Sequence, residues 1–107
     1  MEHQKIFATN IFLLDDFMPG TGEMKAYIHN LWRERDYDTN WQTKSADLHT
    51  KKEFKNFSDL IIMTGKEICV TLGYDVEDVI ITDILATVLK QNEHHPAHTH
   101  SNNFLGG

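Results

Sequence analysis

Residues 94–107 read HHPAHTHSNNFLGG and place four of the seven histidines of the chain within seven positions. This stretch follows residues 79–89, the most strand-like part of the sequence, so we expect a further strand over residues 97–105. Successive side chains of a strand point to opposite faces, so His98 and His100 would share a face, with Thr99 opposite. Because neighbouring imidazoles are common metal ligands, the sequence predicts His98 and His100 as the start of a metal site.

The histidine cluster has two interpretations. In the first, His98 and His100 bind a metal ion, while His94 and His95 lie in the turn before Pro96 and are solvated or support the ligands from outside. In the second, a solvated polar turn holds incidental histidines. A catalytic metal needs about three protein ligands. No residue after this stretch supplies a third, so we expect the front part of a metalloenzyme, cut off after its first ligand motif.

Other kinds of catalytic chemistry lack their motifs in this sequence. With Cys69 as the single cysteine, neither a zinc finger nor a zinc deaminase can form, and its apolar helical surroundings predict a buried thiol. The sequence has no Gly-x-Ser-x-Gly and no glycine-rich phosphate loop. The metal motif of a cupin-type barrel requires a glutamate soon after the histidine pair, but residues 101–105 contain no acidic residue. No catalytic residue is therefore assigned, and the cofactor-binding residues stay unknown.

One strand and two helices are expected before the histidine stretch. Residues 6–14 are aromatic and β-branched, which predicts a strand. Thr21 could cap a first helix, and Gly73 sits where a second helix should end. Apolar residues recur at helical spacing in both. The first stripe comprises Met24, Tyr27, Ile28, Leu31 and Trp32, and the second comprises Phe54, Phe57, Leu60, Ile61, Thr64, Ile68, Cys69 and Leu72.

Two further segments complete this prediction. Residues 33–40 read as a surface loop, and an aromatic such as Trp41 in a polar stretch usually anchors that stretch on the core. Trp32 and Tyr37 are explained in the same structural way. In residues 79–89, one face would carry Thr82, Ile84, Ala86, Val88 and Lys90, and the other Asp83, Leu85, Thr87 and Leu89. Residues 91–96 are short enough for a hairpin-like loop, so this strand should lie antiparallel to the histidine strand.

Composition narrows the class of partner. The net charge is −6, and the ten Lys and Arg residues are scattered, which argues against a nucleic-acid partner because phosphate contacts need clustered basic residues. No segment approaches the roughly 18 apolar residues of a membrane span. The N-terminus also lacks the layout of a signal peptide. We expect a cytoplasmic protein with no membrane partner; the substrate, a protein or a small molecule, and the oligomeric state stay unknown.

Residues 95–105, HPAHTHSNNFL, with Gly107 after them, resemble the iron-binding strand of a family of 2-oxoglutarate/Fe(II) oxygenases. This family is abundant in marine bacteria and their phages and is similar to prolyl 4-hydroxylases. Its motif runs histidine-x-histidine-proline/serine-asparagine-x-x-leucine-serine-glycine, and Gly106 replaces the serine here. Residues 40–44 and 47–49, NWQTK and DLH, look like the family's loop, and residues 6–14 look like its opening strand. The resemblance covers essentially the whole chain.

The resemblance implies a double-stranded β-helix with flanking helices that binds Fe(II), with 2-oxoglutarate as co-substrate. Enzymes of this kind couple decarboxylation of 2-oxoglutarate to O₂ activation and C–H hydroxylation, usually at two histidines and a carboxylate. His98 matches the first histidine. His100 stands two residues on, where the wider superfamily places its carboxylate. The family's distal histidine and the basic residue that pairs with 2-oxoglutarate lie downstream and have no counterpart in this chain.

The expected fold class is α+β: an N-terminal strand and two helices packed on the first strands of an incomplete double-stranded β-helix, or jelly-roll, core. We expect one domain over residues 1–107, with the strand and helices in 1–76 and the first core strands and metal motif in 77–107. The expected function is a fragment of a 2-oxoglutarate- and Fe(II)-dependent dioxygenase or hydroxylase, inactive by itself. The alternative is a small non-catalytic binding or structural module.

Overall fold

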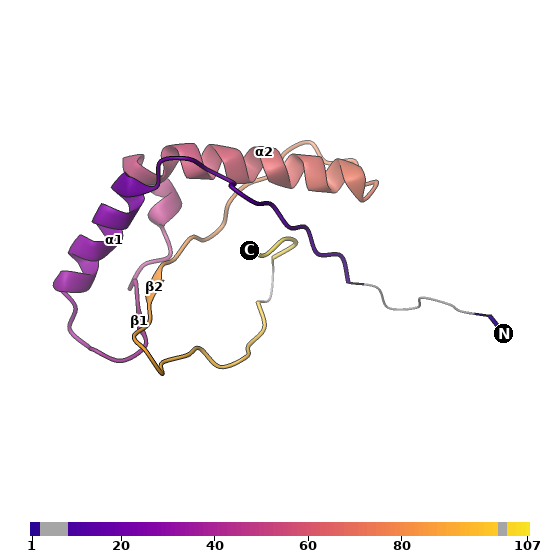
Figure 1. Cartoon of the computed structure of the whole chain (residues 1–107). Coiled ribbons are helices and arrows are strands. Elements are labelled where there is room, and N and C mark those ends of the chain that lie inside the picture. Colours follow the sequence, from indigo (N-terminus) through magenta and orange to yellow (C-terminus); the bar gives the residue numbers. More distant parts are fainter. Residues whose placement is uncertain (3–8, 101–102) are drawn as a thin grey trace.

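The computed structural model describes residues 1–2, 9–100 and 103–107 (Figure 1). Its longest elements are two α-helices, α1 (Gly22–Arg33) and α2 (Lys55–Thr71). The short 3₁₀ helices η1 (Leu48–Thr50) and η2 (Lys52–Phe54) lead into α2. Two short strands, β1 (Trp41–Gln42) and β2 (Thr87–Val88), pair antiparallel. The described part of the chain is therefore α+β, with helices beside one small antiparallel sheet.

Helix α1 begins as the sequence predicts. Thr21 is its N-cap residue, and its carbonyl accepts a 3.0 Å hydrogen bond from the Lys25 amide, but its side chain makes no capping hydrogen bond. Glu23 lies in the first turn and Arg33 in the last, where each charge opposes the helix dipole. Met24 is buried, and the rest of the apolar stripe is partly buried beside it. The predicted helix and its apolar face are confirmed.

Helix α2 ends at a glycine cap. Gly73 has a φ of +81°, a left-handed conformation that glycine adopts without steric cost. The Tyr74 amide donates to the Cys69 carbonyl at 2.9 Å and the Gly73 amide to the Val70 carbonyl at 3.0 Å. This pair of bonds is a Schellman motif. The predicted helix and its glycine end are confirmed, as is the buried thiol of Cys69, which is 2% exposed.

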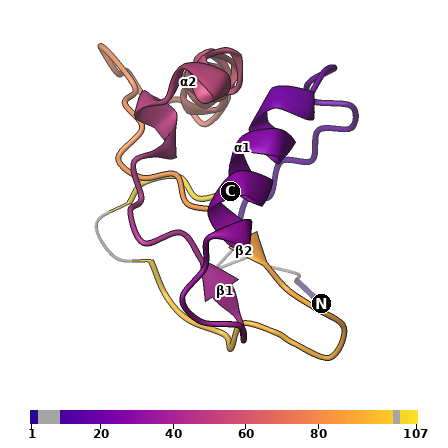
Figure 2. The same ribbon diagram turned by 90° about the vertical axis from the view of Figure 1, so that its left-hand side faces the viewer.

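The core lies where α1 meets the start of α2. Met24, Leu48 and Phe54 form a buried cluster. The ring of Tyr27 meets that of Phe54 edge to face, with centroids 5.8 Å apart. Figure 2 shows α1 beside α2, seen nearly along the α2 axis. Trp41 is also buried, which confirms its predicted role as an anchor for the polar stretch around it.

The small sheet joins the polar stretch after α1 to the strand-like residues after α2. Trp41 pairs with Val88 and Gln42 with Thr87. Beyond the strands, the Thr43 amide donates to the Ala86 carbonyl at 2.9 Å, and the Ala86 amide donates to the Thr43 hydroxyl at 3.2 Å. The predicted alternation holds along the centre of this segment. Its partly buried members are Ile84, Ala86 and Val88, and its exposed members are Leu85, Thr87 and Leu89.

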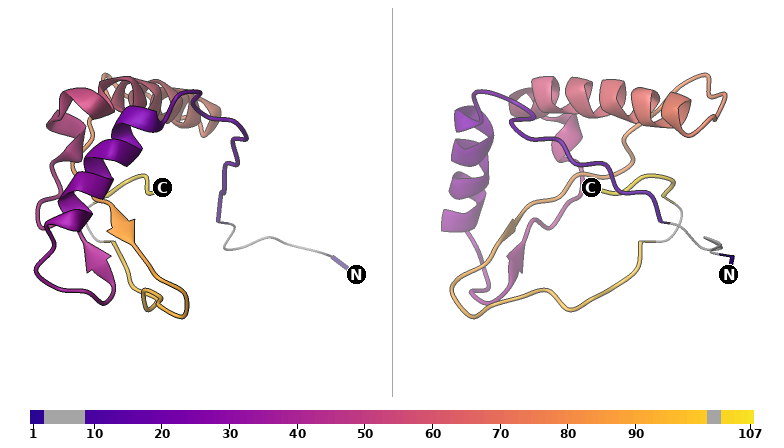
Figure 3. Two further views of the ribbon diagram at one scale, coloured as in Figure 1. Left: turned by 60° about the vertical axis from the view of Figure 1, so that its left-hand side comes forward. Right: turned by 45° about the vertical axis from the view of Figure 1, so that its right-hand side comes forward.

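The predicted pairing of residues 79–89 with the histidine stretch is wrong. Within residues 79–89, β structure is confined to β2 (Thr87–Val88) and an isolated bridge at Ile84. The partner of β2 is β1. Among the described residues of 97–105, none is in a strand. Figure 3 shows this part of the chain looping away from β1 and β2. A strand exists only where a second backbone accepts and donates its hydrogen bonds, and Trp41–Gln42 provides that backbone.

The predicted N-terminal strand is not formed where the structure describes it. Residues 9–14 have no regular secondary structure, and Ile11 and Leu13 are 77% and 89% exposed. The remainder of the prediction, residues 6–8, lies outside the described residues. Aromatic and β-branched composition favours a strand but cannot supply its neighbour.

The molecule is open for its size. Its accessible surface is 9171 Å², whereas a compact protein of 12.4 kDa would expose about 6,100 Å². Its radius of gyration is 17.0 Å, against roughly 13 Å for a compact domain of this length. Phe104 and Leu105 are exposed, as expected for apolar neighbours of the histidine motif. Within the described residues, no helix is long and apolar enough to cross a membrane.

Candidate metal centre

The structure brings the side chains of His98 and His100 together without a strand. Their Nε2 atoms are 2.8 Å apart, and the ring centroids are separated by 4.8 Å with a tilt of 38°. Both residues are exposed. The two imidazoles lie on the same side of the chain, but irregular backbone rather than strand alternation places them there.

A hydrogen bond to the backbone orients the His98 ring. The Nδ1 atom of His98 lies 2.9 Å from the Pro96 carbonyl oxygen, which can only accept, so Nδ1–H is the donor. The Nε2 atom of His98 faces the Nε2 atom of His100, and which of these two nitrogens donates depends on the tautomers. Metal-binding histidines commonly donate their second ring N–H to a backbone carbonyl, which orients the ligand. His98 shows that arrangement.

The distance between the two Nε2 atoms is close to what a metal ion would require. With metal–nitrogen bonds of about 2.1 Å, cis ligands of an octahedral ion are about 3.0 Å apart, and ligands of a tetrahedral ion are about 3.4 Å apart. The observed separation is 2.8 Å. An octahedral ion between the two Nε2 atoms would thus widen the pair by only a few tenths of an ångström, with the ring proton of each neutral imidazole on Nδ1. The residues present fit two positions of such an ion.

The described residues do not complete a metal site. Among them, no group of three or more His, Cys, Asp and Glu side chains could hold a metal ion. His94 and His95, the other two histidines of the cluster, are exposed. The part of the chain that the structure describes therefore offers one pair of ligands.

Contacts on both sides of the histidine segment hold its ends. Before it, the Glu93 carboxylate accepts hydrogen bonds from the backbone amides of Lys90 at 2.9 Å and Asn40 at 3.2 Å. After it, the Thr82 hydroxyl donates to the Asn103 side-chain oxygen at 3.0 Å. These contacts could not be predicted from the sequence, because each depends on a partner that is distant along the chain or on the shape of a turn.

Further contacts hold residues 103–107 against α2 and its C-terminal end. The Phe104 ring meets Tyr74 edge to face, with centroids 5.1 Å apart. A Cβ atom placed on Gly65, in α2, would lie 3.6 Å from a methyl group of Leu105. That distance is ordinary van der Waals packing, whereas the side chain of Val79 would lie only 3.1 Å from the same Cβ atom.

An ion pair ties the turn before the histidines to the loop after α1. The Lys90 ammonium contacts the Asp38 carboxylate, which Arg35 also reaches at 2.8 Å. Hydrogen bonds from Lys90 and Arg35 lower the pKa of Asp38 below its ordinary value. Because this carboxylate is exposed, the pair orients the turn more than it stabilises the fold.

Trp32 and Tyr37, near the start of the family-like loop, have structural contacts. The Arg35 guanidinium lies 3.9 Å from the centre of the Trp32 ring. The Tyr37 hydroxyl donates to the Gln42 carbonyl at 2.8 Å and accepts from the Gln42 amide at 2.9 Å. These contacts fit the structural interpretation made from the sequence.

No family model matches the chain, and no curated protein or solved structure matches it either.

Proposed function

We propose that this chain is the N-terminal part of a 2-oxoglutarate- and Fe(II)-dependent oxygenase, with His98 and His100 as two of the iron ligands. The observation that carries the proposal is the 2.8 Å separation of the two Nε2 atoms, with His98 oriented by the Pro96 carbonyl. Imidazole suits Fe(II), and two histidines with one carboxylate are the usual ligands of such oxygenases. The motif resemblance of residues 95–105 supports the same function.

In this proposal, β1 and β2 belong to a double-stranded β-helix whose other strands come from additional sequence. The open shape of the molecule supports this, since residues 76–89 carry exposed apolar side chains such as Ile80 and Leu85. The third ligand and the residues that bind 2-oxoglutarate would come from that additional sequence too. Fe(II) with 2-oxoglutarate would supply O₂ activation for hydroxylation of a C–H bond. The residues of this chain would hold and orient the metal.

A small binding or structural module is the second candidate function. The observation in its favour is that His98 and His100 are exposed and that the described residues contain no third ligand beside them. In that case the histidines serve no metal. The two candidates differ in whether a metal ion is bound at the His98–His100 pair.

Metal titration of the 107-residue chain tests the proposal. Nickel(II) added to ¹⁵N-labelled protein should broaden the signals of residues 96–100 selectively, because each neutral imidazole can bind the metal through Nε2 with its ring proton on Nδ1. His98→Ala and His100→Ala should each weaken binding by about tenfold or more, since a single histidine of the His98–His100 pair remains. His94→Ala is the matched control and should retain most of the affinity. Similar losses in all three variants would favour incidental binding to a flexible histidine cluster.

Turnover provides a second test. With Fe(II), ascorbate and 2-oxoglutarate, the 107-residue chain should produce no succinate above a metal-only control, because a pair of imidazoles leaves the site incomplete. When the sequence is extended by the remaining strands of the proposed enzyme, turnover should appear and His98→Ala should abolish it. Full activity of the extended protein without His98 would disprove the ligand assignment.

A further inference from the structure

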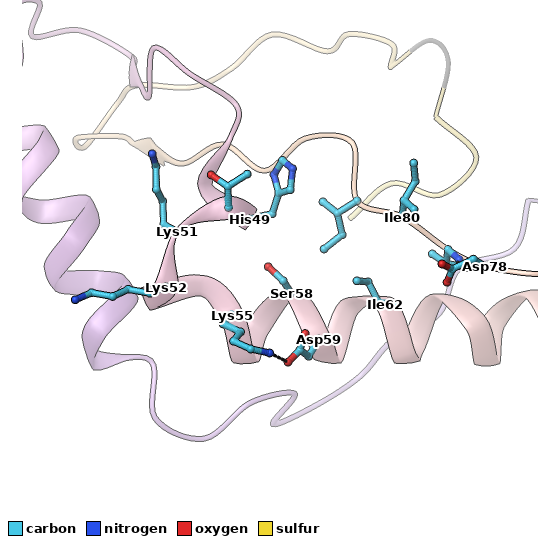
Figure 4. Close-up of a pocket in the computed structure, with 12 residues that line it drawn as sticks. His49, Lys51, Lys52, Lys55, Ser58, Asp59, Ile62, Asp78 and Ile80 are labelled. Atoms are coloured by element: carbon cyan, nitrogen blue, oxygen red, sulfur yellow. Dashed lines mark hydrogen bonds and ion pairs between the residues drawn. The ribbon is translucent and has the colours of Figure 1, made fainter.

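A second, separate pocket lies between the first turns of α2 and residues 78–81. Its volume is about 650 Å³, which is in the range of small-molecule sites. Figure 4 shows the side chains of His49, Ser58 and Ile62 facing this space from η1 and α2. The histidine motif contributes no lining residue. Whatever binds here is therefore independent of the proposed metal centre.

Two polar atoms in the pocket wall have no hydrogen-bond partner within the described part of the chain. The Ser58 side chain is 7% exposed, and its Oγ atom is unpaired; the Nδ1 atom of His49 is also buried and unpaired. In Figure 4 the Ser58 hydroxyl points from α2 into the pocket, on the side where His49 lies. Buried polar atoms nearly always have a partner, so two such atoms in the wall of one pocket point to a ligand. Both can act as donors.

The charges around the pocket favour a negative ligand. Lys51, Lys52 and Lys55 line its end at the start of α2, whereas the protein as a whole carries a net charge of −6. The two lining acids are paired, Asp59 with Lys55 at 2.7 Å and Asp78 with Lys66 at 3.2 Å. Lys51 is paired with Asp47 at 3.5 Å, so Lys52 is the lining lysine without an ion pair among the described residues. The N-terminus of a helix adds a partial positive charge. Donors and positive charge together select an oxyanion.

The opposite wall is apolar. Val79, Ile80 and Ile81 line it, and Ile62 faces them from α2. A bare inorganic ion would leave these side chains without a contact, whereas a ligand with a carbon body would cover them. We propose that the pocket binds an organic oxyanion, a carboxylate or phosphate group attached to an apolar body. The oxyanion accepts hydrogen bonds from the Ser58 hydroxyl and from Nδ1–H of His49, and the apolar body packs on Ile62 and Val79.

The test uses ¹⁵N-labelled 107-residue chain titrated at constant ionic strength with butyrate, butyl phosphate, inorganic phosphate and, as a control, chloride. Saturable shifts are expected at the amides of residues 49–58 and 78–81. The organic anions should bind more tightly than inorganic phosphate. Ser58→Ala should weaken binding by about tenfold, the usual effect of losing a hydrogen bond to a charged group. Lys51→Gln, which removes a positive charge from the pocket, should also weaken anion binding. Lys25→Gln, on the exposed face of α1, is the matched charge control and should leave the affinity unchanged.

The outcomes separate the sources of the oxyanion. Tighter binding of butyrate assigns a carboxylate, and tighter binding of butyl phosphate assigns a phosphate ester. Because alanine favours helix and removes an unpaired buried hydroxyl, Ser58→Ala should not lower the melting temperature. A lower melting temperature with unchanged anion affinity would overturn the proposal by showing that Ser58 is satisfied within the protein. Absence of saturable binding by both organic anions would overturn it as well.

Discussion

The helical region, residues 17–74, and the C-terminal region, residues 75–107, contain similar apolar residues but bury them very differently. In the helical region, Leu48 and Phe54 are 2% and 3% exposed. In the C-terminal region, no described residue is fully buried, and Ile80 is 75% exposed. A helix satisfies its backbone within itself and needs a neighbour for its apolar stripe alone. A strand also needs a neighbouring strand to satisfy its backbone hydrogen bonds, so whether it forms depends on the segment that lies beside it.

The largest expected effect compares two phenylalanines, one from each region. Phe54→Ala should destabilise the protein by about 3–5 kcal/mol, because it empties the core beside Tyr27. Phe104 is 66% exposed. Phe104→Ala should therefore lower the free energy of unfolding by about 1 kcal/mol or less, since only one edge-to-face contact is lost. Urea denaturation followed by the helical circular dichroism signal measures both. Equal losses would mean that the C-terminal region shares the core, and the comparison would fail.

A smaller effect is expected where the two regions meet. Thr43→Val keeps the shape of the side chain but removes the hydroxyl that accepts from the Ala86 amide. The unpaired amide should cost about 1–3 kcal/mol, and hydrogen exchange at Ala86 should accelerate. Thr87→Val is the matched control, because Thr87 is exposed and valine is well tolerated in strands. If both variants behave alike, this hydrogen bond does not hold the regions together.

The smallest expected effect depends on pH. Asp38 has a pKa below its ordinary value of 3.8, chiefly because Lys90 and then Arg35 donate hydrogen bonds to it. The contribution of the Asp38 carboxylate to the stability of the folded state is therefore present above pH 3.8 and is lost as the pH falls through the lowered pKa. Amide shifts of residues 90–93 should change in this acid range, and Asp38→Asn should remove the transition. A transition that persists in Asp38→Asn would show that another carboxylate causes it.

The sequence was most informative about the helices. The apolar stripe from Met24 to Trp32 and the glycine at position 73 marked α1 and the end of α2, because helical spacing and caps are local properties. The alternation of Ile84, Ala86 and Val88 could also be recognised in the sequence. The strand that pairs with this segment could not. Trp41–Gln42 lies in a polar stretch without strand periodicity, so pairing with Thr87–Val88 is a tertiary choice.

For the candidate metal centre, the sequence named the residues and the structure determined their surroundings. His98 and His100 stood out by their spacing. The bond from His98 to the Pro96 carbonyl, which orients the pair, could not be inferred from a strand pattern. The Ser58 pocket gave no sequence signal, because its wall forms only where residues 78–81 pass over α2.

By itself, the sequence determined two amphipathic helices, the glycine end of α2 and the inward face of residues 84–88, and it predicted His98 and His100 as a pair of metal ligands. Each depends on interactions within a few residues, where side-chain periodicity and capping chemistry decide the conformation. The tertiary structure alone decided which backbone pairs with Thr87–Val88 and where Ser58 and His49 meet a pocket. These features depend on contacts made through space, and no local pattern in the sequence encodes the partner.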